Sequence, residues 1–473
     1  MTALQQLPAL IVIVPMLTAP LVLLLKPQGL AWLATLAASL TSFAVAVLLT
    51  TQVLQGVTPT YAMGGWSPPY GIGLSIDSFS AIVLLVVTGA SAMALLAGRA
   101  SIESQIELSR QPYFYAAWLL ALAGFLGIAV SADAFNIFVF MEISSLACYV
   151  LIAGGPDRQA LPAVFKYLIM GTVAATFYLI GVGLVYMMTG TLALADMEAR
   201  IGAVADQSPI LVAAGFIKIG LALKAAVFPL HVWLPNAYTY APHIVTVFLA
   251  ACATKVAIYV LLRFDFFVFQ QNLVSHELQF SFFMLPLAVL AVLIASAAAL
   301  ADSNLKRLLA YSSIAQIGYI LLGASLLTSE GLTAGIVHMF NHALAKGALF
   351  LAVTGLALGG SGLQLEDLRG IARQRPWTMA AIVAAGYSLI GMPGTAGFIS
   401  KWYLISAAAE QGALGAALIV VIVVSSLLAL AYIWRVVEPA YFRQGTSEAA
   451  ASSSGASPWL MAFTWVAVAA NFY

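Results

Sequence analysis

The sequence carries very little charge. Only 8% of its 473 residues are Asp, Glu, Lys or Arg, whereas soluble domains carry about 25%. The net charge is +1, with no basic run or RNA-binding motif, which excludes a nucleic-acid-binding protein. Because 63% of the residues are hydrophobic, the composition indicates an integral membrane protein in contact with a lipid bilayer.

Motifs for cofactors and for chemical energy sources are also missing. There is no Walker A pattern and no Gly-rich dinucleotide fingerprint. Cys148 and Cys252 both lie in apolar segments and fit small core residues better than a disulfide, a metal site or an iron–sulfur cluster. His338 and His342 share one helix face, so they cannot supply opposite axial ligands to a haem. We expect no cofactor and no metal, and we expect an ion gradient or partner subunits to drive the protein.

Long apolar stretches are what the sequence does contain. About 20 apolar residues span the hydrocarbon core of a bilayer. We therefore predict an all-α polytopic membrane protein with about fourteen transmembrane helices. The first lacks a basic signal-peptide segment and is expected to be retained, and the last is short, which fits a truncated C-terminus at Tyr473. The predicted helices are 5–25, 30–54, 76–97, 111–131, 133–153, 162–188, 208–229, 242–263, 280–300, 304–327, 331–358, 377–407, 412–435 and 458–473.

The distribution of basic residues predicts how these helices are oriented. Loops after odd-numbered helices, with the helix ends beside them, hold twelve basic residues, whereas the other side holds only Arg200 and Arg263. Cytoplasmic loops carry the excess of Lys and Arg, so we expect both termini outside a prokaryotic cytoplasmic membrane. The basic residues on the predicted cytoplasmic side are Lys26, Arg99, Arg110, Arg158, Lys166, Lys306, Arg307, Arg369, Arg373, Arg375, Arg435 and Arg443.

Two predicted helices contain residues that break helices. The seventh meets Pro229, and the twelfth is interrupted by glycines and proline between Gly391 and Gly397. Breaks five spans apart suggest two inverted five-helix repeats, helices 4–8 and 9–13, as in many transporters. The predicted domains are helices 1–3 in 1–110, the first repeat in 111–263, the inverted second repeat in 264–435, and a C-terminal segment with helix 14 in 436–473.

Six ionisable side chains fall in the middle of these apolar stretches: Glu142, Lys218, Lys224, Lys255, Lys346 and Lys401. Each costs roughly 2.5–3.5 kcal/mol at the centre of a bilayer, so six would cost on the order of 15–20 kcal/mol. A membrane protein retains such charges where they line an ion or proton path. The alternative for Glu142 is a structural ion pair or a neutral, hydrogen-bonded acid.

Individual positions differ in how strongly they favour a proton path. Lys224 lies one turn before the Pro229 break, where freed carbonyls and water would stabilise an ammonium. Lys218 lies about 240° around the helix from Lys224, and it either snorkels to the surface or contacts a neighbouring subunit. Lys255 lies too deep in its helix to snorkel easily. His231, beside the first break, is either a gating residue or a plain cap.

Three ionisable side chains also line up on the predicted eleventh helix. His338, His342 and Lys346 are spaced i, i+4 and i+8 and share a face. Histidines that titrate near neutrality beside a buried lysine make a plausible relay, which leads towards Lys401 beyond the second break. The alternative for each histidine is a satisfied hydrogen bond between helices.

Four motifs resemble the antiporter-like subunits of the proton-translocating NADH:quinone oxidoreductase superfamily. They are KAAVFPLHVWLPNAY at 224–238, LKRLLAYSS at 305–313, FNHALAK at 340–346 and GMPGTAGFISK at 391–401. The resemblance covers about helices 3 to 13 and implies a 14-helix inverted-repeat fold with a polar axis along the membrane midplane. It implies switch charges on helices 5, 7, 8, 11 and 12, which correspond to Glu142, Lys224, Lys255, His342 and Lys401.

Within that superfamily the chain is most similar to the D-type component of multisubunit Mrp Na⁺/H⁺ antiporters. Gln316 stands where related respiratory subunits commonly have a histidine, and Lys rather than Glu at 401 argues against one of the complex I subunits. We therefore expect a subunit of a hetero-oligomeric complex that exchanges external H⁺ for internal Na⁺. In its mechanism we expect Glu142 and Lys224 to form an ion pair whose opening releases the proton of Lys224. The alternatives are a proton-pumping subunit of a complex I-like enzyme or membrane hydrogenase, and a stand-alone uniporter or amino-acid carrier.

Overall fold

The computed structural model describes residues 3–25, 28–204, 208–269, 276–444 and 457–472. Lys26, which contributes to the predicted orientation, lies outside the described residues. The predicted end of the last helix at Tyr473 does too. Almost all of the described chain is α-helix, as predicted, with one short antiparallel hairpin that pairs Thr60 with Ser75.

The chain divides into two compact units. Unit 1 comprises Met1–Ala92, Ile106–Ala225 and Cys252–Leu278, and unit 2 comprises Met93–Gln105, Ala226–Ala251 and Gln279–Tyr473. Helices α3 (Ser78–Gln105) and α10 (His243–Arg263) each contribute residues to both units.

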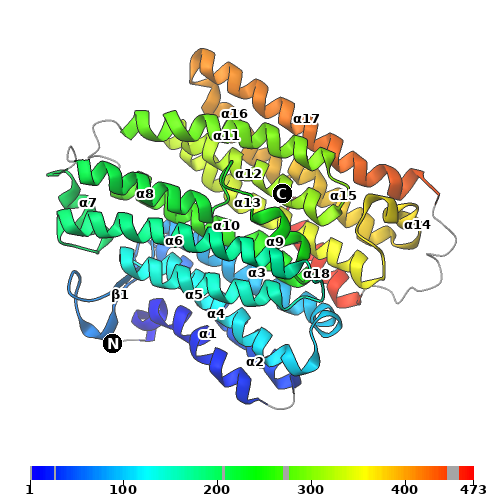
Figure 1. The fold of residues 1–473 in the computed structure, drawn as a ribbon, viewed down its shortest axis with the longest axis horizontal. Helices are drawn as coiled ribbons and strands as arrows, with labels where there is room; N and C mark the ends of the chain where they lie inside the picture. The colour runs from blue at the N-terminus through cyan, green and yellow to red at the C-terminus, as the bar shows by residue number, and fades with distance from the viewer. Residues whose placement is uncertain (1–2, 26–27, 205–207, 270–275, 445–456, 473) are drawn as a thin grey trace. The chain divides into compact units, whose positions relative to one another are not determined.

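Unit 1 is built from the N-terminal helices. Within it, α6 and α8 lie side by side, and α4 packs against α1 and α5 (Figure 1). Helix α4 is almost completely buried. Within its most apolar stretch of 18 residues, 89% of the residues are buried, because neighbouring helices cover it on every side. Besides parts of α3 and α10, the elements are η1 (Ala3–Gln6), α1 (Leu7–Leu24), α2 (Gln28–Leu54), β1 (Thr60–Ala62), η2 (Met63–Gly65), β2 (Gly73–Ser75), η3 (Leu108–Arg110), α4 (Gln111–Val130), α5 (Ala134–Ala153), α6 (Ala160–Thr189), α7 (Leu194–Ile201), α8 (Ser208–Lys224) and the π-helical turn η4 (Phe264–Val268).

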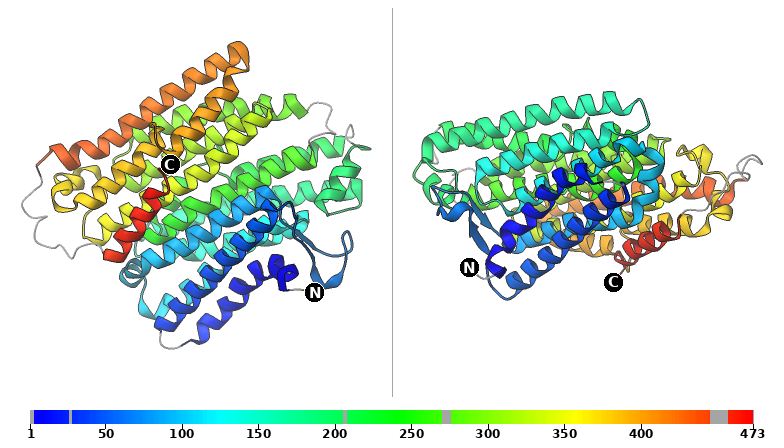
Figure 2. Two further views of the ribbon diagram at one scale, coloured as in Figure 1. Left: turned by 180° about the vertical axis from the view of Figure 1, so that it is seen from behind. Right: turned by 90° about the horizontal axis from the view of Figure 1, so that it is seen from below.

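Unit 2 is organised around α13 (Ser329–Leu358). This helix packs against α12, α15, α16 and α18, and Figure 2 shows the same neighbours from behind and from below. Helix α17, by contrast with α4, is mostly uncovered: only 28% of the residues in its most apolar stretch of 18 are buried. The other elements are α9 (Leu234–Tyr240), α11 (His276–Ala301), α12 (Leu305–Ala324), η5 (Leu365–Leu368), α14 (Ile371–Gln374), α15 (Pro376–Ile390), α16 (Ala396–Ala409), α17 (Gly412–Phe442) and α18 (Pro458–Ala469).

Ten helices in the described part of the chain are long and apolar enough to cross a membrane. They include α1 to α6, α10, α11, α13 and α17. The other elements that fall in predicted spans are shorter or less apolar; α8, α15, α16 and α18 have 17, 15, 14 and 12 residues. The finding is therefore a polytopic all-α membrane protein, and the count of fourteen spans stays a prediction.

Both predicted helix breaks are confirmed. Helix α8 ends at Lys224, and Ala226 adopts a left-handed conformation with φ of 55° before the proline-containing segment that leads to α9. Helix α15 ends at Ile390, followed by Gly391 at φ of 87°, and α16 starts after Thr395, whose side chain accepts a hydrogen bond from the amide of Phe398. At the second break the carbonyls of Leu389 and Ile390 accept hydrogen bonds from the Lys401 side chain, because the left-handed residue interrupts the helical hydrogen bonds.

Candidate functional site

The last residue of α8 carries a buried ammonium that contacts α5. Lys224 Nζ lies 2.6 Å from Ser145 Oγ and 3.5 Å from Glu142 Oε1. Glu142 and Ser145 are three residues apart and so lie on one face of α5. The Lys224 side chain is 6% exposed and that of Glu142 is 31% exposed. The predicted pair of Glu142 and Lys224 is therefore brought together, with a serine that the sequence analysis did not single out.

A small cavity adjoins this ion pair. It has a volume of about 30 Å³ and is lined by Lys224, Ser144 and Ser145 on one side and by residues of α10 such as Ala253 and Val256 on the other. Its walls are mostly apolar, but Ser144, Ser145 and Lys224 supply polar groups, and a space of this size can hold one water molecule. It offers a position from which a proton could be exchanged with the Lys224 ammonium.

Gly171 of α6 makes room for this arrangement. A Cβ atom at this position would collide with the Tyr149 hydroxyl and would lie 3.6 Å from Lys224 Nζ. The glycine therefore permits α6 to approach α5 and α8 at the depth of the ion pair.

Lys255 lies in α10 and is 1% exposed. It is within unit 1, as is the Lys224 pair, but it is not among the residues that line the cavity beside Lys224. Its predicted burial is confirmed. The cavity-lining residues Val256 and Val260 are its close neighbours on the same helix.

Lys218 differs from the expectation that it snorkels or contacts a neighbouring subunit. Its Nζ lies 2.7 Å from Asp265 Oδ1, with side-chain exposures of 11% and 0%. Asp265 lies in the π-helical turn that follows α10. The sequence analysis missed this carboxylate because it lies just beyond the predicted end of the helix at 263. The available signal was a lone acidic residue between phenylalanines.

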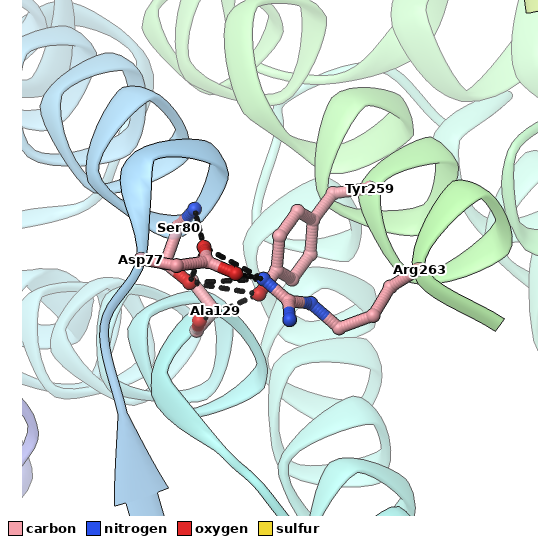
Figure 3. Close-up of polar contacts among 5 residues, drawn as sticks. All are labelled: Asp77, Ser80, Ala129, Tyr259 and Arg263. Carbon is pink, nitrogen blue, oxygen red and sulfur yellow. Dashed lines mark hydrogen bonds and ion pairs between the residues drawn. The ribbon is translucent and has the colours of Figure 1, made fainter. Parts of the chain in front are cut away.

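A second polar cluster surrounds the C-terminal end of α10 (Figure 3). Arg263 Nη2 donates to both carboxylate oxygens of Asp77, at 2.8 and 2.7 Å, and to Ser80 Oγ at 3.2 Å. Tyr259 donates its hydroxyl hydrogen to the carbonyl of Ala129 at 2.9 Å. Arg263 was predicted to be a loop charge; instead it connects the start of α3 to the end of α10.

In unit 2, both ring nitrogens of His338 have hydrogen-bond partners. Nδ1 lies 2.8 Å from Ser400 Oγ and Nε2 lies 2.9 Å from Gln316 Oε1. The ring stacks on His342, with centroids 6.4 Å apart, and meets the ring of Tyr319 edge-on at 5.4 Å. The uncharged Gln316 is thus part of the histidine cluster.

Lys346 is fully buried one turn beyond His342. Its Nζ donates to the Leu309 carbonyl at 2.7 Å and to Ser312 Oγ at 2.5 Å. Both acceptors belong to α12, within the LKRLLAYSS segment. The predicted line of His338, His342 and Lys346 is therefore buried along one face of α13.

Lys401 lies directly against the break between α15 and α16. Its Nζ is 3.0 Å from the carbonyl oxygens of Leu389 and Ile390 and 3.0 Å from Ser426 Oγ. It also lies 4.7 Å from the centre of the Tyr319 ring. Since Tyr319 touches His338 as well, this ring lies between the histidine pair and Lys401.

Two further residues, His231 and Lys306, lie near the segment that joins α8 to α10. His231 stacks on Phe228, with centroids 5.2 Å apart, and is half-buried. Lys306 was predicted to be a loop charge, but it is 2% exposed and donates to the carbonyl of Ala241 at 2.7 Å. Through this hydrogen bond Lys306 connects α12 to the joint between α9 and α10. Pro242, which follows Ala241 at this joint, has no N–H.

Among the described residues no three His, Cys, Asp or Glu side chains form a group that could hold a metal ion. Cys148 and Cys252 are both free thiols and buried. The ionisable side chains described above lie in pairs and short lines, an arrangement that can transfer protons.

Comparison with known proteins gives the family. Residues 131–429 match the model described as "NADH:quinone oxidoreductase/Mrp antiporter, TM". The chain is 43% identical over 441 residues to the N-type component of the NADH-quinone oxidoreductase of Desulforudis audaxviator, covering 92% of this chain and 87% of that protein. It is 30% identical over 428 residues to the D-type component of the Na⁺/H⁺ antiporter of Bacillus subtilis, covering 90% and 85%. Identity with this oxidoreductase protein thus exceeds identity with this antiporter protein.

Solved structures agree with that assignment. A chain of the membrane-bound sulfane sulfur reductase, an archaeal respiratory membrane complex, superposes with a TM-score of 0.90 at 30% identity, covering 98% of this chain and 94% of that one. A chain of the Mrp complex from a Dietzia species superposes with a TM-score of 0.88 at 28% identity, covering 100% and 94%. The protein belongs to the family of transmembrane subunits shared by NADH:quinone oxidoreductases and Mrp antiporters.

Proposed function

We propose that this chain is a proton-translocating subunit of a multisubunit membrane complex. The observation that carries the proposal is the Lys224 ammonium, buried at a helix break within reach of both Ser145 and Glu142. An ammonium with a carboxylate partner holds its proton, and moving the carboxylate away makes the proton easier to release. The separation of 3.5 Å is long for such a pair, which fits a contact that opens and closes.

In the proposed mechanism the Glu142–Lys224 pair opens and Lys224 gives up its proton. Lys255 receives it, and the lysine–histidine line of unit 2 carries it onward through His342 and Lys346 towards Lys401. His338 belongs to this route in addition, because its ring contacts both His342 and Tyr319. Each rearrangement needs only a few kcal/mol, since one pKa unit corresponds to about 1.4 kcal/mol.

We further propose that Na⁺/H⁺ exchange drives this transfer. The similarity to a protein of the Bacillus subtilis Na⁺/H⁺ antiporter and to a chain of an Mrp complex supports this assignment. The proposal includes partner subunits of a hetero-oligomeric complex, H⁺ and Na⁺ as the transported ions, and a prokaryotic cytoplasmic membrane with both chain termini outside. It also includes fourteen spans, with inverted repeats in 111–263 and 264–435.

The second candidate is a proton-pumping subunit of a redox enzyme. The 43% identity to a protein of an NADH-quinone oxidoreductase favours it, as does the similarity to a chain of an archaeal respiratory complex. In that case the same side chains would move protons, and electron transfer in partner subunits would supply the energy.

Proton movement in inverted membrane vesicles tests both candidates. The complete complex is expressed in a strain without its own antiporters, and a pH-sensitive dye reports the decay of a preformed ΔpH after addition of NaCl. Lys224→Ala removes the ammonium, and Lys166→Ala, an exposed lysine of α6, is the matched control. Sodium-triggered decay that is lost only in Lys224→Ala is the expected result.

Two other outcomes count against parts of the proposal. One is an intact complex that shows no response to sodium and instead acidifies the vesicles when a reduced substrate is supplied. That result would refute the antiporter assignment and support the redox-driven pump. Wild-type transport by an assembled Lys224→Ala complex would remove Lys224 from the proton path under either driving reaction.

A further inference from the structure

The Lys218–Asp265 ion pair is more enclosed than the Lys224–Glu142 pair, and the proposed route does not use it. The two side chains are 11% and 0% exposed, against 6% and 31% for Lys224 and Glu142. The separation of 2.7 Å between Nζ and Oδ1 is that of a short charge-assisted hydrogen bond. A proton on this line can shift between nitrogen and oxygen without any movement of the two helices.

The end of α10 is built so that Asp265 faces α8. Residues two positions apart on a helix point to nearly opposite sides. Arg263 points to Asp77 at the start of α3 (Figure 3), so Asp265 points away from α3. Asp265 follows within the π-helical turn, in which the amide of Phe269 donates to the carbonyl of Phe264. Such turns occur often at functional sites. Here the turn directs a carboxylate to a lysine on a different helix from the one that Arg263 contacts.

A purely structural role explains this pair poorly. Apolar residues of similar size would hold two helices together at least as well, because charges lose more on leaving water than the pair regains. An ionisable residue inside a membrane therefore points to a function in ion or proton movement. This reasoning applies to Asp265 with particular force, since its side chain is completely buried.

The pair shares helix α8 with the proposed switch residue. Lys218 and Lys224 belong to the same helix, six residues or roughly 9 Å apart along its axis. Lys224 lies at the end next to the helix break, and Lys218 lies near the middle of α8. One helix thus carries two buried lysines, and each of them has a carboxylate partner from another helix.

We propose that Lys218 and Asp265 form a second proton-relay pair of this subunit, in series with Lys224. In the step, the Lys218 ammonium loses one proton as an N–H bond breaks, and the Asp265 carboxylate gains it as an O–H bond forms. The net charge of the pair stays zero, and two neutral groups, an amine and a carboxylic acid, result. The Lys218 amine then accepts the next proton, and the Asp265 acid delivers its own to the following acceptor. This inference rests on the proposed function, because it assumes that protons cross unit 1.

Lys218→Arg separates a relay from a structural pair. Arginine keeps the positive charge and the ion pair, but it does not give up its proton in proteins. The double variant Lys218→Met with Asp265→Leu removes both charges and leaves no unpaired one. Replacement of the surface pair Arg200–Asp196 by Met and Asn is the matched control. Assembly is measured by copurification with a tagged partner subunit, and transport by the vesicle assay under sodium and under redox drive.

A relay predicts that both the Arg variant and the double variant assemble and that each loses at least about 90% of wild-type transport, roughly a tenfold fall. The surface control keeps its full rate. Wild-type transport by either variant would overturn the inference. If one variant does not copurify, transport by the other variant tests the inference, because Lys218→Arg keeps both charges of the pair and the double variant removes both. A wild-type complex that moves no protons under either drive would instead refute the proposed function.

Discussion

Replacing Glu142 by Gln tests the central ion pair most directly, because it removes one charge and almost no volume. Two unit charges 3.5 Å apart attract by about 5 kcal/mol at an effective dielectric constant of about 20. Water screens the Glu142 side chain, which is 31% exposed, so we take less than half of this value, about 2 kcal/mol. That difference corresponds to about a 30-fold smaller equilibrium constant for binding of a proton to Lys224.

The expected result is a fall of at least tenfold in the initial rate of proton movement. Ser145 Oγ stays 2.6 Å from Lys224 Nζ, so the variant is expected to fold and assemble. Glu103→Gln, which removes the exposed partner of Arg99 at the surface, is the control and should leave the rate unchanged. The vesicle dye assay measures the rate, and copurification of the subunits measures assembly. An assembled Glu142→Gln complex with the wild-type rate would refute the reasoning.

Three further predictions concern other parts of the protein. Gly171→Ala pushes a Cβ atom into the Tyr149 hydroxyl and should slow proton movement severalfold, whereas Gly183→Ala, with no atom within 4 Å, should not; equal rates would contradict the close approach. His338→Gln can keep its hydrogen bonds but cannot carry a proton, so it should slow transport as strongly as His338→Leu. A normal transport rate in the Gln variant would show that the histidine has only a structural role. Asp77→Asn removes the carboxylate that accepts from Arg263, and it should lower the free energy of unfolding in detergent by about 1–2 kcal/mol; an unchanged unfolding curve would show that the cluster adds no stability.

Much of the fold follows from hydrophobic length and from prolines and glycines. The apolar stretches predict where the helices lie, and Pro229 and Gly391 predict both breaks, because these residue types act on the local backbone. The π-helical turn after α10 was not predictable in this way. Its residues Phe264–Val268 are apolar apart from Asp265, and nothing in their pattern separates a π turn from an α-helix.

Most of the candidate site was predictable one residue at a time, and among its ion pairs only that of Glu142 with Lys224 was expected. A charge inside an apolar stretch is visible in the sequence, so Glu142, Lys224 and Lys218 could be named from it, whereas Asp265, the partner of Lys218, was missed. The partners Ser145 and Ser312 escaped notice because serine is common in membrane helices, and only the packing of α5 and α12 brings their hydroxyls to a lysine. Lys306 was misjudged because position near a predicted helix end does not distinguish a surface charge from one that folds inward.

The environment of Lys401 connects its protonation state to the shape of the backbone. As an ammonium it offers one N–H to each of three acceptors, and two of these are the carbonyls of Leu389 and Ile390 at the end of α15. A helix end buried without donors is unstable. A neutral amine has one hydrogen fewer, so loss of the proton leaves a carbonyl in need of a new donor. Water or a shift of the chain around Gly391 would have to supply it. Lys401 would then act as a removable helix cap, so that each departing proton loosens the α15–α16 joint and each arriving one closes it.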